Sequence, residues 1–426
     1  MTDSFSRQFD EDGYRYIKIS PAQLRLQKLI KKSAQTVLRF LFTCFGFVIF
    51  IWERLQRLLR PHLQNRQPQK ILIIRVDFIG DVVMTLPAVH TLRQVFPNAQ
   101  IDFLTTPAPA QLIQRHKDIS RVYVCNPNAW LGKPFSAAVW QEIARLRKIL
   151  RTEQYDLALS VSGDWASILA LLSGATKRYG YAKEAYPFFV TNSLPGGRYD
   201  VRQHESQYGL QLIAAAVPNA PKWQPSAAIL TPQQTDRDRI QLLLAPFGVT
   251  ETDMLIALHL GSGNGTAKRW PIPYWAALAD KLRAAYPACA IALIGAEADT
   301  PLAERALAKM QNKRRVFSLT GATSLTDLIA ISARCAILIS ADSGPSHIAA
   351  ATGALTLALH GPTDPEIYGP QGPNTRYIWN KTWCAPCYDP SDTAECRFGA
   401  PICMKGITPE AVEAAAVEML NAAKIF

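Results

Sequence analysis

The sequence predicts an α/β protein with two Rossmann-like parallel-sheet domains that face a cleft, preceded by a basic N-terminal helical appendage. Three observations support this fold class. Short apolar runs alternate with segments that have the periodicity of a helix. This alternation occurs twice, on either side of a Pro- and Gln-rich stretch at 218–234. Basic residues concentrate near the N-terminus. A chain of 426 residues accommodates two to three domains. The predicted domains are residues 1–69, 70–235 and 236–426.

The N-terminal appendage carries most of the positive charge. Residues 1–70 hold 13 basic and 5 acidic side chains, whereas the whole chain has a net charge of +12. The remainder is therefore only weakly basic, which argues against a nucleic-acid-coating protein. Ser20 and Pro21 form a typical helix start, and the uncharged run 40–52 follows basic residues.

That run spans about 20 Å as a helix, which is less than the roughly 30 Å of a bilayer core. A helix of this kind is expected to lie at an anionic membrane surface, as a peripheral or monotopic anchor. The alternative is a helix packed on the protein's own core or in a dimer contact.

Two series of apolar runs predict the strands of the two sheets. The first series is 71–76, 101–104, 122–125 and 157–161, with a helical pattern at 137–150. The second series is 255–260, 290–294, 316–319, 336–339 and 355–360, and a last helix is expected at 408–423. Strands alternating with helices are typical of βαβ units in a parallel sheet.

A first candidate site follows the first strand, in the segment 75–87. Gly80 allows a tight turn there, and Asp81 falls at the start of the next helix. A carboxylate at the crevice end of a parallel sheet can accept a proton from a substrate hydroxyl. The alternative is that Asp81 only caps the helix. Pro87 is expected to kink this helix.

A second candidate site opens the Ala-rich helix after the strand at 336–339. Ser343, Gly344 and Pro345 provide a small-residue helix entry that suits a diphosphate. His347 can point a ring nitrogen at the same phosphates, and Asp342 can bind sugar hydroxyls. The alternatives are capping by Asp342 and Ser343 and a structural histidine.

A third candidate site is the glycine-rich loop after the strand at 255–260. Ser262 and Gly263 lie in the loop, and Lys268 lies at its far side, where it can neutralise a leaving diphosphate. The pattern is not a P-loop, because the lysine does not follow the required spacing. An exposed turn is the alternative. Glu297, after the strand at 290–294, can accept hydrogen bonds from ribose hydroxyls or can be a surface carboxylate.

Four cysteines crowd near the C-terminus: Cys384, Cys387, Cys396 and Cys403. The first two form a C-x2-C pair, which is typical of structural zinc sites, whereas the spacing of the second pair is loose. A structural zinc ion and four reduced thiols are equally compatible with the sequence. The sequence carries no export signal, which disfavours disulfides.

These motifs together resemble glycosyltransferase family 9, whose best-known members are lipopolysaccharide heptosyltransferases. The resemblance is carried by R-x-D-x-I-G-D-x-x-x-T-L-P at 75–87, K-R-W-P at 268–271, D-S-G-P-x-H-x-A-A-A at 342–351 and H-G-P-T-D-P at 360–365. It covers roughly residues 70–424. The basic N-terminal appendage is a departure from the family pattern.

The resemblance implies a GT-B fold and sugar transfer with inversion, without an essential metal cofactor. Asp81 would be the base and Lys268 would stabilise the leaving diphosphate. Asp342 would hold the donor sugar, Thr85 would lie near the transferred sugar, and the other donor contacts would be Ser343, Gly344, His347 and Glu297. The implied donor is a nucleotide sugar, ADP-heptose above all, and the acceptor a glycolipid.

The expected location is the cytoplasmic face of a bacterial inner membrane. Lys177 and Arg178 are expected on the acceptor side, with a solvated turn as the alternative. Rival functions are a nucleotide-sugar epimerase or hydrolase of GT-B fold and a catalytically inactive membrane scaffold. A nicotinamide dehydrogenase is the weakest rival, because the G-x-G-x-x-G fingerprint is missing.

Overall fold

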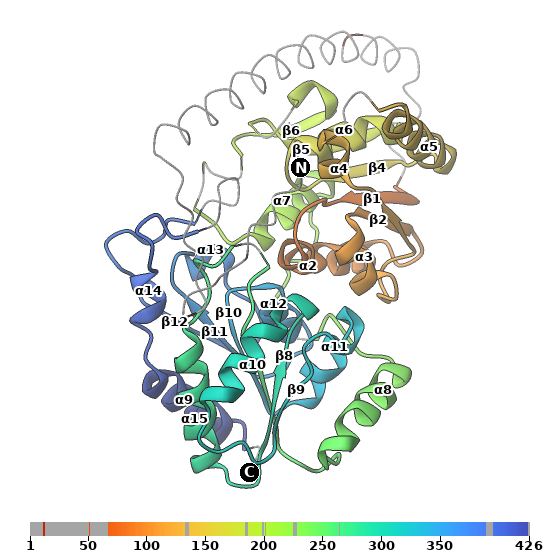
Figure 1. The fold of residues 1–426 in the computed structure, drawn as a ribbon. Coiled ribbons are helices and arrows are strands. Elements are labelled where there is room, and N and C mark those ends of the chain that lie inside the picture. The colour runs from red at the N-terminus through yellow and green to blue at the C-terminus, as the bar shows by residue number, and fades with distance from the viewer. Residues whose placement is uncertain are drawn as a thin grey trace. The chain divides into compact units, whose positions relative to one another are not determined.

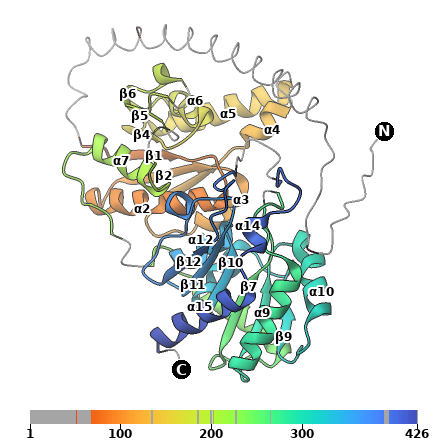
Figure 2. The ribbon, with the colours of Figure 1, turned by 90° about the vertical axis from the view of Figure 1, so that its left-hand side faces the viewer.

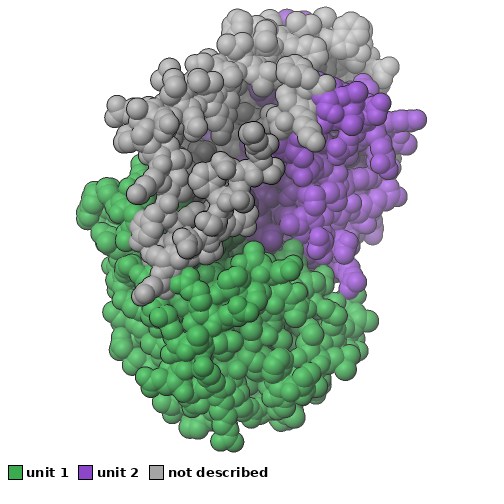
Figure 3. Space-filling view, viewed as in Figure 1, with its two compact units in different colours: residues 1–18, 225–426 green, residues 19–224 purple. Residues whose placement is uncertain are grey.

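A computed structural model of the chain describes Asp12, Ile51 and residues 67–132, 136–183, 186–197, 200, 202–224, 228–263, 265–388 and 395–424. Nearly all of the predicted N-terminal appendage, residues 1–69, lies outside these residues. The described part divides into two compact units, one within residues 19–224 and the other within residues 225–426 together with Asp12 (Figure 3). No helix in the described part is long and apolar enough to cross a membrane.

The first unit is a six-stranded parallel sheet in the order β3-β2-β1-β4-β5-β6. Its strands are β1 (Lys70–Ile74), β2 (Gln100–Thr105), β3 (Arg121–Val124), β4 (Leu157–Ser160), β5 (Lys177–Tyr181) and β6 (Asn192–Leu194). Its helices are α2 (Ile79–Val95), α3 (Pro107–Ile113), α4 (Pro127–Gly132), α5 (Ala137–Glu153), α6 (Asp164–Ser173) and α7 (Ser206–Ala216), with a 3-10 turn η2 (Pro187–Phe189).

The helices of this unit cover both faces of the sheet (Figure 1). Helix α2 contacts α3 and α7, whereas α5 contacts α6. Along β1, Leu72 and Ile74 join a core with side chains of α4, α5 and α6. Successive side chains of a strand point to opposite faces, so the equally buried Ile71 and Ile73 serve the other face. Burial on both faces explains why the strand reads as a continuous apolar run.

The second unit repeats the design, with the order β12-β11-β10-β7-β8-β9. Its strands are β7 (Leu255–His259), β8 (Ala290–Ile294), β9 (Val316–Ser318), β10 (Ile337–Ala341), β11 (Thr356–His360) and β12 (Thr375–Trp379). Its helices are α8 (Gln234–Leu244), α9 (Ile272–Ala285), α10 (Thr300–Lys309), α11 (Leu325–Arg334), α12 (Gly344–Ala351), α13 (Pro365–Tyr368), α14 (Ile402–Lys405) and α15 (Pro409–Ala422), with 3-10 turns η3 (Ala245–Phe247) and η4 (Glu297–Asp299).

Helices α9, α10 and α15 pack together over one side of the second sheet (Figure 2). Helices α8, α11 and α12 pack together as a second group (Figure 1). Trp270, Trp275 and Met404 are buried in the first of these layers. The Trp270 indole nitrogen donates to the carbonyl of Ile407 at 2.8 Å, which ties the C-terminal segment to this unit. The last helix therefore belongs to the C-terminal sheet.

All nine predicted strands are present, each with ends within about two residues of the prediction. Three further strands, β5, β6 and β12, were not predicted. Helix α2 continues through Pro87 as one element. The second unit includes residues ahead of α8, because the backbone nitrogens of Ile229 and Leu230 donate to the carbonyl of Ala351.

Strand order makes each sheet doubly wound. In the first unit, the chain adds strands from β1 toward one edge of the sheet and then from β4 toward the other edge. In the second unit, the same change of side occurs between β7 and β10. In such sheets, ligands bind beyond the carboxyl ends of the strands at this switch point. The loops that follow β1, β4, β7 and β10 are therefore where a site is expected.

A buried hydrogen bond in the first unit predicts a stability effect away from these loops. The Tyr155 hydroxyl donates to Asp102 Oδ2 at 2.6 Å, and both side chains are buried. Tyr155→Phe leaves a buried carboxyl group without this donor, which should lower the free energy of unfolding by about 1–3 kcal/mol. The measurement is urea unfolding, with Tyr179→Phe, at a half-buried tyrosine of the same unit, as the matched control. Equal losses in the two variants would contradict the prediction.

Candidate functional site

The first candidate site lies where β1 runs into α2. Asp81 is in the first turn of α2, as predicted. The position before the helix is occupied by Phe78, and the structure gives it no side-chain capping bond. Asp81 instead places Oδ1 3.0 Å from Nη2 of Arg75, which is fully buried. The ion pair with Arg75 therefore holds this carboxylate at the start of α2.

Arg75 also forms ion pairs with two further carboxylates. Its Nη2 donates to Glu205 Oε1 at 2.8 Å, and its Nε lies 2.8 Å from Asp77 Oδ2. A buried guanidinium is costly unless acidic partners surround it, and three carboxylates supply that compensation here. The cluster fixes the orientation of Asp81. Sequence reasoning missed Glu205, which is 130 residues away from Arg75 and follows no recognisable motif.

Thr85 lies one turn after Asp81 in α2. Its hydroxyl donates to the backbone carbonyl of Asp81 at 2.9 Å, and its side chain is buried. The i to i+4 spacing places the two residues on the same face of the helix. The structure thus brings Thr85 next to the candidate base.

The second and third candidate sites are one site in the C-terminal unit. Lys268, after β7, places Nζ 2.8 Å from Asp342 Oδ2, after β10. The side chains are 15% and 4% exposed, so the ion pair is largely shielded from water. β7 and β10 are the adjacent strands at the switch point of this sheet. The two motifs, 74 residues apart in sequence, therefore form one charged centre.

The surroundings of Asp342 and His360 determine which of the two groups is charged. Burial disfavours the charge on Asp342, but Lys268 and the nearby histidines outweigh it, so the pKa of Asp342 lies well below its ordinary value. Burial acts in the opposite sense on the neighbouring His360 and lowers its pKa to about 4. Asp342 is thus anionic and His360 neutral near pH 7.

The N-terminus of α12 borders the same centre. Ser343 is its N-cap residue and Gly344 its first residue. The Ser343 hydroxyl lies 3.2 Å from Nδ1 of His259, which is also 3.1 Å from the hydroxyl of Ser340. Burial lowers the pKa of His259, so its ring is neutral between these hydroxyls. This network joins the ends of β7 and β10.

His347 is buried in the first turns of α12, with Nε2 3.7 Å from Asp342 Oδ1. Its Nδ1 is buried and makes no hydrogen bond to any described group. A buried polar atom of this kind usually has a partner, so it points to a ligand or water at this helix end. Together with the positive end of the helix dipole, this nitrogen makes the start of α12 suited to an anion.

The remaining predicted donor contacts lie at neighbouring strand ends. Ser262 is half-buried and Gly263 exposed in the loop after β7, and Glu297 is exposed after β8. Asp299, which sequence reasoning missed, is buried against this loop: a Cβ on Gly261 would lie only 2.3 Å from its Oδ1. Only glycine permits that approach, so this glycine serves packing.

Arg178 and Lys177 lie in β5, so the solvated-turn alternative is wrong. The Arg178 side chain is buried, and its guanidinium donates to the carbonyls of Phe189 at 2.7 Å and Ala175 at 2.9 Å. These bonds give Arg178 a structural role: they tie β5 to the segments around Phe189 and Ala175. Lys177 is half-buried on the same strand.

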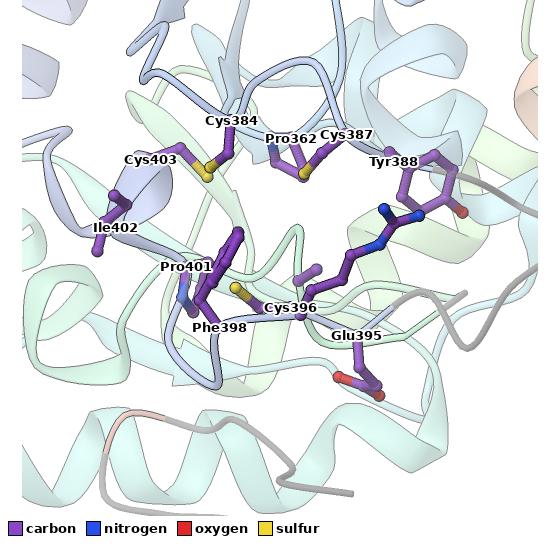
Figure 4. A pocket seen from close by; sticks show the side chains of 12 residues that line it. Pro362, Cys384, Cys387, Tyr388, Glu395, Cys396, Phe398, Pro401, Ile402 and Cys403 are labelled. Atoms are coloured by element: carbon purple, nitrogen blue, oxygen red, sulfur yellow. The ribbon is translucent and has the colours of Figure 1, made fainter. Parts of the chain in front are cut away.

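The four C-terminal cysteines are reduced and line one pocket (Figure 4). Figure 4 shows their sulfur atoms around a common space beside the ring of Phe398. Burial raises the pKa of Cys387, Cys396 and Cys403, the last to about 12. Across the described residues, no group of three or more His, Cys, Asp or Glu is arranged to hold a metal ion. The structural zinc ion stays a prediction from spacing.

The two doubly wound parallel-sheet units have the GT-B fold. The family model described as glycosyltransferase family 9 (heptosyltransferase) matches residues 143–397. The chain belongs to glycosyltransferase family 9, and it is a glycosyltransferase.

Individual relatives agree with this assignment. The chain is 29% identical over 313 residues to a lipooligosaccharide heptosyltransferase 2 of Haemophilus ducreyi, covering 71% of this chain and 86% of that protein. Among solved structures, a family 9 glycosyltransferase from Veillonella parvula superposes with a TM-score of 0.69 at 22% identity, covering 83% of this chain and 98% of that one. An E. coli heptosyltransferase solved with ADP gives 0.64 at 22% identity, covering 82% and 99%.

The buried His360 predicts acid sensitivity. Its pKa is about 4 in the folded protein against 6.5 ordinarily, so the unfolded chain binds more protons between these pH values. The free energy of unfolding should therefore fall as the pH drops from 6.5 to 4, by up to about 3 kcal/mol. Urea unfolding at a series of pH values should show a flatter dependence for His360→Gln. Parallel curves for the two proteins would contradict the assignment.

Proposed function

We propose that the protein is an inverting, metal-independent transferase that moves a heptose from ADP-heptose to a lipopolysaccharide-core or related glycolipid. The observation that carries the proposal is the buried Lys268–Asp342 pair at the switch point of the C-terminal sheet, beside the N-terminus of α12. Heptosyltransferase relatives and the ADP in the related E. coli structure support the choice of donor.

The donor contacts follow from charge. Lys268 and the N–H groups at the start of α12, near Ser343 and Gly344, would neutralise the diphosphate. Asp342 would accept from sugar hydroxyls, and His347 would donate to a phosphate oxygen. Glu297 would accept from the ribose, with Ser262 and Gly263 allowing close approach of the diphosphate to the loop.

Asp81 would act as the general base. The acceptor hydroxyl oxygen attacks the anomeric carbon from the face opposite the diphosphate, and its proton passes to the Asp81 carboxylate. The new C–O bond forms as the bond to the diphosphate breaks, so the anomeric configuration inverts. The electron pair leaves with ADP, whose growing charge Lys268 and α12 stabilise in place of a divalent cation. Thr85 would lie beside the transferred sugar.

The proposal for acceptor binding is based on basic residues in the sequence. Lys177 would attract a phosphorylated glycolipid, whereas the hydrogen bonds of Arg178 favour a structural role. The basic, apolar segment within residues 1–69 would attach the enzyme to the cytoplasmic face of the inner membrane, close to such an acceptor.

Loss of the base should abolish turnover. We expect Asp81→Ala to lower acceptor-dependent ADP release from ADP-heptose by at least about 100-fold, the usual contribution of general base catalysis. The assay compares wild type and variant with and without purified lipopolysaccharide-core acceptor, each in EDTA. Asp77→Ala, at a half-buried carboxylate of the same cluster, is the matched control and should retain more activity. Undiminished release by the Asp81 variant would refute the mechanism, and EDTA-sensitive release would refute metal independence.

Deleting residues 1–66 should release the protein from membranes while the two sheets stay folded. The measurement is membrane fractionation combined with circular dichroism. The deletion also removes Asp12, which accepts from Lys405 Nζ at 2.6 Å, so full-length Asp12→Ala is the control and should remain in the membrane fraction. Retention of the truncated protein with membranes would argue against the anchor.

A further inference from the structure

The cysteine-bearing segment that follows β12 touches the glycine-rich loop after β7 at two points. Glu395 Oε2 accepts from the backbone nitrogen of Thr266 at 3.1 Å and also from the Thr266 hydroxyl. Two residues further along the loop, Lys268 Nζ lies 3.9 Å from the ring centroid of Tyr388. Neither Tyr388 nor Glu395 belongs to a motif that predicted the site.

These contacts restrain the side chain of Lys268. A lysine side chain has four rotatable bonds, and ordering it costs conformational entropy. Lys268 is held from two sides, by the Asp342 carboxylate at 2.8 Å and by the face of the Tyr388 ring. An ammonium group over an aromatic face is stabilised by the ring quadrupole. The ordering cost is therefore met before any donor arrives.

The segment that provides Tyr388 is itself anchored. The backbone nitrogens of Cys387 and Tyr388 both donate to the carbonyl of Pro362, at 2.9 and 3.0 Å, just beyond the end of β11. Ala267, between the two restrained loop residues, and Pro362 both line the pocket that contains the four cysteines, here called the thiol pocket. The thiol pocket thus adjoins the glycine-rich loop at Ala267.

We propose that Tyr388 and Glu395 are positioning residues for the donor: they clamp the glycine-rich loop so that Lys268 is already placed for a nucleoside diphosphate. This proposal rests on the proposed function, because it takes Lys268 as the group that meets the diphosphate. It adds two residues of the cysteine-bearing segment to the determinants of donor affinity.

Calorimetric titration of the full-length protein with ADP tests the proposal. We expect Glu395→Ala and Tyr388→Leu each to raise the Kd for ADP about tenfold, the usual consequence of losing one charge-assisted contact. Tyr388→Phe keeps the aromatic face and should bind within about twofold of wild type. Glu395→Gln keeps one acceptor oxygen and should fall between wild type and Glu395→Ala. Glu251→Gln, at an exposed carboxylate on a remote turn, is the control.

Hydrogen–deuterium exchange without nucleotide gives an independent readout. Peptides covering residues 261–270 should exchange faster in Glu395→Ala and Tyr388→Leu than in wild type, with equal exchange in the strands of the same sheet. Unchanged loop exchange, or equal loss of ADP affinity in Tyr388→Phe and Tyr388→Leu, would overturn the proposal even if the wild type transfers sugar. A wild type that binds none of ADP, UDP and GDP would instead refute the proposed function on which it rests.

Discussion

The ion pair between Lys268 and Asp342 is the contact on which the C-terminal site depends. It joins the loop after β7 to the turn after β10, across the one place in the sheet where the two flanking loops diverge. Both groups are shielded from water, so removing either leaves an uncompensated buried charge, which costs far more than an exposed ion pair contributes. The surrounding elements, His347, His360 and the start of α12, are arranged around this pair.

The N-terminal unit also holds a buried charged cluster, with a different balance of charges. There a single buried cation, Arg75, is shared by three carboxylates, of which Asp81 is the one on the helix that follows β1. In each unit a charged centre sits after the first strand, where the doubly wound topology leaves space for a ligand. The two centres differ in their chemistry. The C-terminal centre suits an anion such as a diphosphate, and the N-terminal centre presents an oriented carboxylate.

Local sequence patterns predicted most of the scaffold because strands buried on both faces appear as continuous apolar runs. The strands that were missed are short, polar or near sheet edges: β6 is Asn-Ser-Leu, and β12 exposes Tyr377. The sequence motifs singled out Asp81, Lys268 and Asp342 as candidate site residues. In the structure, Lys268 and Asp342 form an ion pair.

Pairings between distant residues could not be predicted in this way. Glu205 and Glu395 reach their partners across 130 and 129 residues, and a lone glutamate carries no local signal. Arg178 is a different case, since this basic residue, which suggested ligand binding, donates to the backbone carbonyls of Phe189 and Ala175. Charge in a sequence does not reveal whether the partner is a ligand or the chain itself.

In the proposed mechanism, donor binding and proton abstraction depend on different charged centres. The most direct test compares ADP affinity and sugar transfer in Asp81→Asn and Asp342→Asn, each measured beside the wild type. We expect Asp81→Asn to bind ADP like the wild type but not to transfer the sugar. Asp342→Asn, which removes the carboxylate charge that pairs with Lys268, should change ADP affinity as well as transfer. Transfer that survives in Asp81→Asn, or ADP affinity that depends on Asp81 and not on Asp342, would contradict it.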